Sequence, residues 1–404
     1  PAPRASEMLF AKACEKIGLK THAHPTAILT KDKGDRSACF YATNCIRGCS
    51  IGAAFDSVTG FIQPALKTGN LTIISHAHVL QVLTDASGKK ATGVLYVDRE
   101  TETRRKVQAK VVVLAAGSMQ SCRIMLNSAT DKAPEGLGNS SGMLGKYVSD
   151  TLFTNISVQL PTFVGLPPHN EDGISQPHLY APGQLTEKQK QEQGLDFSGS
   201  YKLEVDPYGG GRFGLPGMSS TVRFLLYFSK GAYGKKLKHY MRKNYGSYIG
   251  LRSFGSMSLN EKCSVRLDDK ETDKWGMPSA RFHWELTDED FRRVKYMNSL
   301  LLKVAKAMGA KLLYDGFERS RKAGKLVGYK GGSVNHETGG CRMGDNPNAS
   351  VLNEYSCSWD VPNLYVADAA PFVNHTEKNP TLTIMALSMR AADNIVSRLK
   401  EGTL

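Results

Sequence analysis

Apolar side chains at helical spacing predict three helices along the chain. Residues 5–17 repeat apolar positions every three or four residues and are followed by a glycine. Residues 287–308 open with a threonine and, three positions later, an aspartate, the spacing of a capping box, and continue with a regular apolar stripe. Residues 380–402 begin with a proline and end with a glycine, which makes Asn379 the expected N-cap.

Short runs rich in Val, Ile, Leu and Thr predict a meander of strands before residue 120, at residues 70–75, 79–83, 91–98 and 104–115. The last of these ends in the apolar run 111–117, which is typical of a strand buried on both faces that enters a helix through a glycine. A helix through Ile124 and Leu126 is expected to follow.

The pattern changes between about residue 150 and residue 330. Alternating segments at residues 155–160, 219–228 and 264–267 are joined by long loops that contain glycine and proline. This arrangement predicts a mainly antiparallel sheet covered by helices. The fold class expected for the whole chain is therefore α/β, with an α+β region in its middle.

The composition is that of a globular protein. The chain has 404 residues, of which 41% are apolar, enough for two domains with a sizeable core. Lys and Arg number 52 against 38 Asp and Glu, and the excess is spread out apart from a concentration between Lys230 and Lys243. Such a run can contact nucleic acid or an acidic surface, but a solvated face is the favoured interpretation, and no nucleic-acid partner is expected.

The location of the protein stays open between cytoplasm and periplasm, because an export signal before Pro1 is compatible with this sequence. No stretch approaches about eighteen consecutive apolar residues, so no transmembrane segment is predicted. The sequence also leaves the oligomeric state open.

Three of the eight cysteines, Cys39, Cys45 and Cys49, lie close together in sequence. Three thiolates at such spacing could hold an iron-sulfur cluster or a metal ion. The spacing is not a standard zinc or ferredoxin pattern, and no fourth ligand lies close in sequence. Free or disulfide-linked thiols in a glycine-containing loop are the favoured interpretation, so no metal site is assigned.

Residues 209–214 formally match the Gly-x-Gly-x-x-Gly pattern of dinucleotide-binding loops. No buried strand leads into this string, and Leu-Pro-Gly follows it where a helix would be required. A flexible loop is therefore expected at this position.

The candidate chemistry lies near the C-terminus. His336 opens the string His-Glu-Thr-Gly-Gly-Cys-Arg-Met-Gly, a short apolar strand ends at Asp368, and Asn379 precedes Pro-Thr. A glycine turn and a short strand could bring His336 and Asn379 together. Such a pair can accept the proton of an alcohol while the carbon-bound hydrogen leaves as hydride. The helix start after Asn379 would stabilise negative charge on a reduced flavin.

Taken together, these strings resemble the C-terminal signature of the glucose-methanol-choline (GMC) family of flavin oxidoreductases. The resemblance implies that the cofactor is FAD, that His336 is the catalytic base and that Asn379 is its partner. It also implies cofactor contacts from Val79, Ala116, Gly117, Asp368, Ala369, Pro380 and Thr381. Of these, Val79 would lie against the adenine, Asp368 and Ala369 along the ribityl-diphosphate portion, and Pro380 and Thr381 beside the isoalloxazine ring.

The same resemblance implies a domain organisation. Residues 1–149 would form the later part of a Rossmann-like FAD-binding domain, residues 150–330 a substrate-binding domain, and residues 331–404 a return to the FAD-binding domain with the catalytic residues. The family's N-terminal glycine fingerprint, which holds the FAD diphosphate, is absent from this sequence. We therefore expect a missing N-terminal segment or a second chain to complete the FAD site.

The reaction expected from the resemblance is FAD-dependent oxidation of an alcohol group of a sugar or glycoside. The strings are most similar to the sugar-oxidising branch, with its pyranose oxidase-like and gluconate or fructose dehydrogenase-like enzymes, and oxygen, a quinone or a cytochrome could accept the electrons. Two other classes stay open. One is an electron-transfer flavoprotein subunit of a membrane or cytochrome-linked dehydrogenase complex, and the other is a non-catalytic binding or assembly subunit.

Overall fold

The computed structural model describes residues 2–40, 48–166, 177–206, 229–244, 246–322 and 334–404. It divides into two compact units. Unit 1 comprises residues 1–72, 153–255 and 292–328, and unit 2 comprises residues 73–152, 256–291 and 329–404. Each unit is therefore assembled from three stretches that are distant in sequence.

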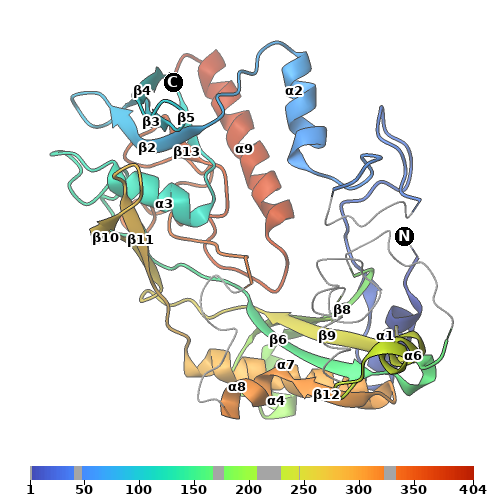
Figure 1. Ribbon diagram of the computed structural model, residues 1–404. Coiled ribbons are helices and arrows are strands. Elements are labelled where there is room, and N and C mark those ends of the chain that lie inside the picture. Colours follow the sequence, from blue (N-terminus) through green and yellow to red (C-terminus); the bar gives the residue numbers. More distant parts are fainter. Residues whose placement is uncertain (1, 41–47, 167–176, 207–228, 245, 323–333) are drawn as a thin grey trace. The chain divides into compact units, whose positions relative to one another are not determined.

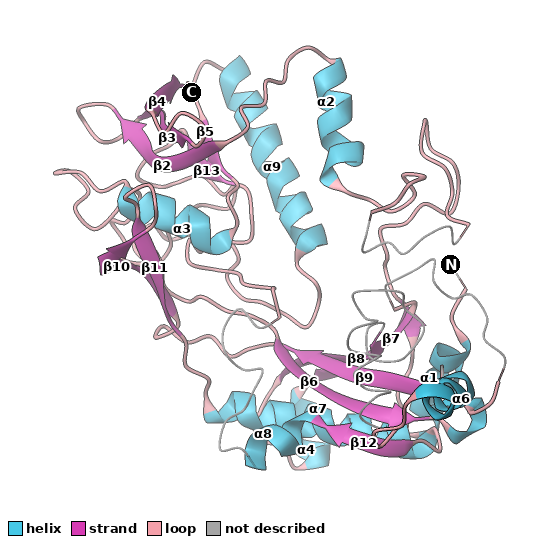
Figure 2. Cartoon of the chain, viewed as in Figure 1, coloured by secondary structure: helices cyan, strands magenta, loops and turns pink. Residues whose placement is uncertain are grey.

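A six-stranded sheet forms the centre of unit 1, in the order β1-β7-β8-β9-β6-β12 (Figure 1; Figure 2). Its strands are β1 (His22–Ala23), β6 (Leu152–Gln159), β7 (Leu179–Leu185), β8 (Gly199–Asp206), β9 (Tyr248–Gly255) and β12 (Lys311–Asp315). The pairs β1–β7, β7–β8, β8–β9 and β6–β12 are antiparallel. The prediction of a mainly antiparallel sheet in the middle of the chain is confirmed.

Helices pack against this sheet. The described helical segments that lie wholly or mostly in unit 1 are α1 (Ala5–Lys16), the π-helical turn Val58–Ile62, α2 (Gln63–Lys67), the 3-10 turn Pro161–Phe163, α4 (Glu187–Gln193), α6 (Gly234–Asn244), α7 (Asp288–Ala307) and α8 (Gly316–Lys322), of which α2 and the turn before it lie away from the sheet. Figure 1 shows α7 running along one face of the sheet, where Tyr296 packs edge-on against Tyr201 of β8 with ring centroids 5.7 Å apart. The predicted capping box of α7 is confirmed by hydrogen bonds between Thr287 and Asp290. None of the described helices combines the length and apolar character needed to cross a bilayer.

The described residues of unit 2 form three small sheets and two helices. Strands β2 (Ala77–Thr84), β3 (Ala91–Asp98) and β4 (Arg104–Gln108) form an antiparallel meander, β5 (Val112–Leu114) pairs in parallel with β13 (Leu364–Val366), and β10 (Ser264–Thr272) forms a hairpin with β11 (Pro278–His283). The helices are α3 (Ser118–Asn127) and α9 (Thr381–Lys400). Because α3 contacts the meander and the hairpin, its buried side chains join both to one core.

One buried asparagine ties the meander to the parallel strand pair. Asn363 is 4% exposed, and its side-chain oxygen accepts a hydrogen bond of 2.9 Å from the backbone N–H of Ala91. Its side-chain nitrogen donates to the carbonyl groups of Ala91 and Lys110, each at 2.8 Å. The side chain thus satisfies three backbone groups from the start of β3 and the segment before β5.

Several local predictions were wrong. Residues 70–75 form no strand, and Ile73 and Ile74 stay more than half exposed because the meander begins only at Ala77. Residues 104–115 divide into β4 and β5, because the chain leaves the meander to pair with β13. Val113 is 46% exposed, so β5 is not buried on both faces. The predicted strand at residues 219–228 and the glycine string at residues 209–214 lie outside the described residues.

Replacing Asn363 by alanine is expected to lower the free energy of unfolding by about 2 to 4 kcal/mol, because three buried backbone groups lose their partner. Urea unfolding measures the change. The exposed Asn348→Ala provides the control and should change stability by less than about 0.5 kcal/mol. Equal effects of the two substitutions would show that Asn363 does not hold these elements together.

Candidate active site

His336 is held beside Thr151 by a backbone bridge. Ser149 and Thr338 exchange two backbone hydrogen bonds of 3.0 and 2.9 Å, and their hydroxyl oxygens are 2.8 Å apart. His336 lies two residues before one end of this bridge and Thr151 two residues after the other. As a result, the hydroxyl oxygen of Thr151 lies 3.1 Å from Nδ1 of His336. This contact orients the imidazole ring.

Two glycines allow the loop after His336 to pass close to its neighbours. Gly339 and Gly340 have φ values of +81° and +91°, a region that favours glycine. A Cβ atom at Gly339 would lie 2.4 Å from the carbonyl oxygen of Tyr147, and one at Gly340 would lie 2.5 Å from Sγ of Cys122. Glycine is therefore required at both positions of the string that follows His336.

The same loop lies alongside the segment that follows β13. The N–H groups of Gly339, Cys341 and Met343 donate hydrogen bonds of 3.0, 3.1 and 2.9 Å to the carbonyl groups of residues 369, 370 and 371. This pairing joins the string of His336 to the string of Asp368. Two of the three sequence strings singled out above are thus adjacent in space.

A buried carboxyl group lies next to the histidine loop. Asp150 is 4% exposed and accepts hydrogen bonds from the N–H groups of Thr151 at 2.7 Å and Val334 at 3.4 Å. Burial raises the pKa of Asp150 to about 6; the negative charge of Glu337 adds to the rise and the backbone N–H groups oppose it. The charge close to His336 therefore changes in mildly acidic solution.

A second histidine, His375, lies beside His336 and was missed by the sequence analysis. The two rings are nearly perpendicular, with centroids 5.9 Å apart, and the ring of Phe372 lies 6.3 Å from that of His375. His375 is 2% exposed, and its Nε2 atom has no hydrogen-bond partner in the described part of the chain. Burial lowers the pKa of His375 to about 4, and the positive charge of protonated His336 adds to the effect. His375 is consequently neutral at pH 7.

The sequence gives only weak hints of the three residues that its analysis missed, His375, Asp150 and Thr151. His375 stands four positions before Asn379, within the loop that joins two of the motif strings. Asp150 and Thr151 stand where the sequence pattern changes, near residue 150. Only their position in the fold reveals that they surround His336.

Asp368 joins the end of β13 to the start of α3. It is 7% exposed, accepts a hydrogen bond of 2.5 Å from the hydroxyl of Ser121 and another of 2.7 Å from the N–H of Ala370. Burial raises the pKa of the Asp368 carboxyl group, while the Ser121 hydroxyl and backbone N–H groups counteract the rise. Gly117 is the N-cap of α3, with a φ of +88°, and no atom would lie within 4 Å of a Cβ built there. The backbone at this helix start is therefore accessible.

The start of α9 differs from the prediction. The N-cap is Pro380, without a side-chain capping bond, so the expectation that Asn379 caps the helix is wrong. The reason lies in the backbone: the carbonyl group of Pro380 accepts the first intrahelical bond, from Ile384, at 2.9 Å. Asn379 lies immediately before the cap, and Thr381 is the first helical residue.

The remaining predicted cofactor residues lie in unit 2 on separate elements. Val79 lies on β2, paired with Tyr96 of β3. Ala116 follows β5 and is exposed, and Ala369 is buried beside the histidine loop. No cofactor contact of these residues is tested by the fold alone, so each remains a prediction.

The cysteine cluster is only partly described. Cys39 is half-buried and Cys49 is a free thiol, whereas Cys45 lies outside the described residues. Although partial burial opposes it, hydrogen bonding from the N–H groups of Ala54 and its neighbours lowers the pKa of the Cys49 thiol. Within the described ranges, no three His, Cys, Asp or Glu side chains are grouped as metal ligands.

Two curated relatives align over almost the whole chain. The 2-methyl-1,2-propanediol dehydrogenase of Mycolicibacterium austroafricanum is 29% identical over 392 residues, which cover 97% of this chain and 66% of that protein. The fructose dehydrogenase large subunit of Gluconobacter japonicus is 26% identical over 394 residues, with the same two shares. The chain thus spans about two thirds of the length of these relatives.

Family models and solved structures agree with this relationship. Residues 2–152 match the N-terminal family model described as GMC oxidoreductase, and residues 260–388 match the C-terminal model of the same description. The crystal structure of pyridoxine 4-oxidase from Mesorbium loti shares the fold, with a TM-score of 0.61 at 15% identity over 98% of this chain and 70% of that one. The predicted fold class is confirmed, and the chain belongs to the GMC oxidoreductase family.

Proposed function

We propose that the protein oxidises an alcohol group of a sugar or glycoside, with His336 as the base and Asn379 as its partner. The observation that carries the proposal is the oriented imidazole, whose Nδ1 lies 3.1 Å from the hydroxyl oxygen of Thr151. Nε2 of His336 accepts the hydroxyl proton, and the amide of Asn379 orients the hydroxyl oxygen. FAD, the cofactor of this family, accepts the hydrogen of the alcohol carbon as hydride when it is bound.

The residues of unit 2 fit such a cofactor. Because the backbone of Gly117 is accessible at the start of α3, a phosphate or ribityl oxygen could approach its N–H groups closely. The twenty-residue helix α9 begins at Thr381 and presents its partial positive charge at its start. This charge would stabilise the anionic edge of a reduced isoalloxazine. Asp368, Ala369 and Ala116 are assigned to the cofactor on the family pattern.

The substrate class rests on the relatives and on the polar groups around His336. One relative is named for fructose and another for a diol, and both substrates carry more than one hydroxyl group. Thr151, Asp150 and His375 surround His336 with a hydroxyl, a carboxyl and a neutral imidazole. Such groups suit a ligand that presents more than one hydroxyl.

An exposed apolar surface supports the proposal that a further segment completes the FAD site. Leu382, Met389 and Val396 are 70%, 67% and 49% exposed, and their spacing of seven residues puts them on one stripe of α9. Val113 of the parallel strand pair is exposed as well. Since apolar stripes of this kind are normally covered, we assign this surface to a missing N-terminal segment or a second chain.

The variant His336→Ala is expected to slow reduction of bound FAD by substrate about 10^2- to 10^4-fold, because proton transfer to a positioned base contributes a factor of this size. FAD content should change little. Stopped-flow absorbance of the flavin-loaded protein, supplied with the segment proposed to complete the FAD site, measures both with a panel of sugars. His283→Ala, at an exposed histidine of β11, is the control and should behave as the wild type. An unchanged reduction rate in His336→Ala would remove this residue from the mechanism.

We expect these 404 residues expressed alone to retain well under one FAD per chain, and to bind FAD once the completing segment is supplied. In the completed protein, Leu382→Asp should lower FAD content. The substitution places a charge on the apolar stripe of α9, where the completing segment is proposed to pack. Leu312→Asp, at an exposed leucine of unit 1, is the matched control. Visible flavin absorbance after desalting is the measurement, and stoichiometric FAD on the chain alone would contradict the proposal.

The buried His375 predicts a loss of stability in acid. Its pKa is lowered from 6.5 to about 4 in the folded state, so unfolding takes up a proton between these values and stability falls with falling pH. Between pH 7 and pH 5 this should cost about 2 kcal/mol, a loss that His375→Phe should abolish. The raised pKa of Asp150 acts in the opposite sense, but equally in both proteins.

Urea unfolding of wild type and variant at the two pH values tests this expectation. His283→Phe serves as the control and should retain the pH dependence of the wild type. If His375→Phe loses as much stability in acid as the wild type, His375 does not titrate as a buried neutral residue.

A further inference from the structure

Helix α6 and its surroundings carry a concentrated positive charge that the proposed reaction does not use. Residues 229–249 contain no Asp or Glu and six basic residues, namely Lys230, Lys235, Lys236, Lys238, Arg242 and Lys243. All six are exposed in the described structure. Within that part of the chain, no ion pair joins them to a carboxylate, in contrast to Lys190 of α4, which pairs with Glu187 at 3.0 Å. Their charge is therefore available to a partner.

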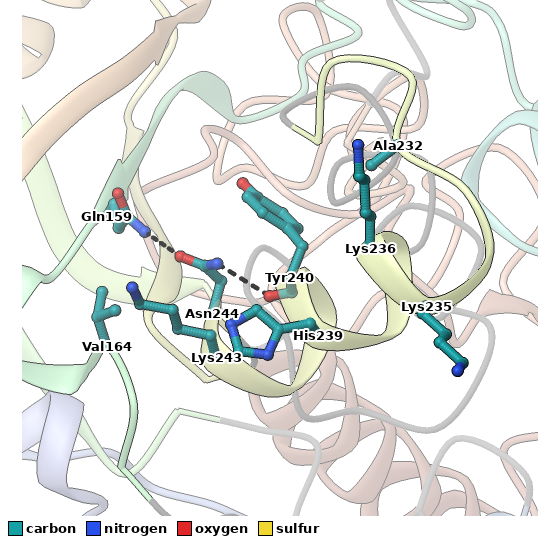
Figure 3. A pocket seen from close by; sticks show the side chains of 9 residues that line it. All are labelled: Gln159, Val164, Ala232, Lys235, Lys236, His239, Tyr240, Lys243 and Asn244. Atoms are coloured by element: carbon teal, nitrogen blue, oxygen red, sulfur yellow. Dashed lines mark hydrogen bonds between the residues drawn. The ribbon is translucent and has the colours of Figure 1, made fainter.

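The basic residues border a hollow in unit 1. This basic groove has a volume of about 730 Å³. Figure 3 shows the side chains that line it, which are Gln159, Val164, Ala232, Lys235, Lys236, His239, Tyr240, Lys243 and Asn244. Among the described residues, no acidic side chain lines it. The hollow is shallow and open to solvent, so an extended ligand can approach the lysines directly.

The helix is firmly attached to the sheet beneath it. The side-chain nitrogen of Asn244 donates to the carbonyl group of Tyr240 at 2.9 Å, and its oxygen accepts from the side chain of Gln159 on β6 at 2.9 Å. The hydroxyl groups of Tyr240 and Tyr248 of β9 are hydrogen-bonded to each other. The side-chain amides of Gln159 and Asn244 are thus hydrogen-bonded to each other. The lysines that line the groove are therefore the groups that can recognise a ligand.

The groove does not have the form of a small-anion site or of a membrane-binding helix. Small anions are held by converging, fixed donors such as arginine forks or backbone N–H groups, whereas lysines are flexible point charges. These lysines are spread over a helix of eleven residues, about 16 Å long. The apolar positions Leu237, Tyr240 and Met241 are partly buried, so no broad apolar face is left to enter a bilayer.

We propose that the basic groove on α6 binds an acidic segment of a protein partner. Several carboxylates distributed along a chain match several cations distributed along a helix, and the groove admits their side chains. This complementarity speeds association and selects the partner, and it weakens with salt. The inference rests on unit 1 alone and is independent of the proposed oxidation.

The test uses fluorescently labelled poly-L-glutamate as the probe for the chain, with anisotropy measured at low and high salt. In the variant Lys235→Glu/Lys236→Glu/Lys243→Glu the affinity should fall by at least about tenfold, because three favourable pairs become repulsive. The control Lys303→Glu/Lys306→Glu/Lys311→Glu changes the net charge equally on α7 and β12 of the same unit, and should reduce the affinity by no more than about twofold. Replacement of the groove lysines by glutamine should give an intermediate loss. Circular dichroism verifies that each variant is folded.

Equal losses in the groove variant and the control would overturn the proposal, since only the net charge would then matter. Absence of binding to poly-L-glutamate at low salt would also overturn it. So would tighter binding of double-stranded DNA, or of vesicles that contain anionic lipid, through the same three lysines, because the partner would then belong to another class.

Discussion

The candidate active site depends on the pairing of one glycine-containing loop with two other segments of unit 2. Ser149 and Thr338 form the first pairing, and residues 339–343 form the second with residues 369–371. A Cβ atom at Gly339 would lie 2.4 Å from the carbonyl oxygen of Tyr147, and one at Gly340 would lie 2.5 Å from Sγ of Cys122, so neither position accepts a side chain. The position of His336 therefore follows from backbone hydrogen bonds that only glycine permits. An imidazole held in this way needs little reorganisation to take up the role of base proposed for it.

Burial adjusts the polar groups around this loop in different directions. It raises the pKa of Asp150 and of Asp368 and lowers that of His375, because in each case the charged form is the one that loses solvation. Asp368 is compensated by hydrogen bonds from Ser121 and Ala370, so it holds two elements together. His375 has no such partner at Nε2 within the described residues, and its buried imidazole stays neutral beside His336. The neighbours of His336 thus include a buried carboxyl group and a second imidazole ring.

The two units carry different kinds of surface. Unit 2 has the histidine loop, two helix starts suited to an anionic cofactor and an apolar stripe on α9. Unit 1 has a mainly antiparallel sheet, and a hydrogen bond between Gln159 of β6 and Asn244 fixes the basic helix to it. The proposed catalysis and the proposed partner binding can therefore be tested separately, because no described residue is shared between the groove and the surroundings of His336.

The sequence by itself determined the fold class, the family and the ends of well-patterned elements such as α1 and β3. These depend on local residue order: apolar period, capping residues and ordered strings around His336 and Asp368. Only the tertiary structure decided that His375 is buried beside His336, that residues 104–115 split between two sheets and that Pro380 rather than Asn379 caps α9. Each of these depends on contacts between segments far apart in sequence or on the path of the backbone, which residue periodicity does not record.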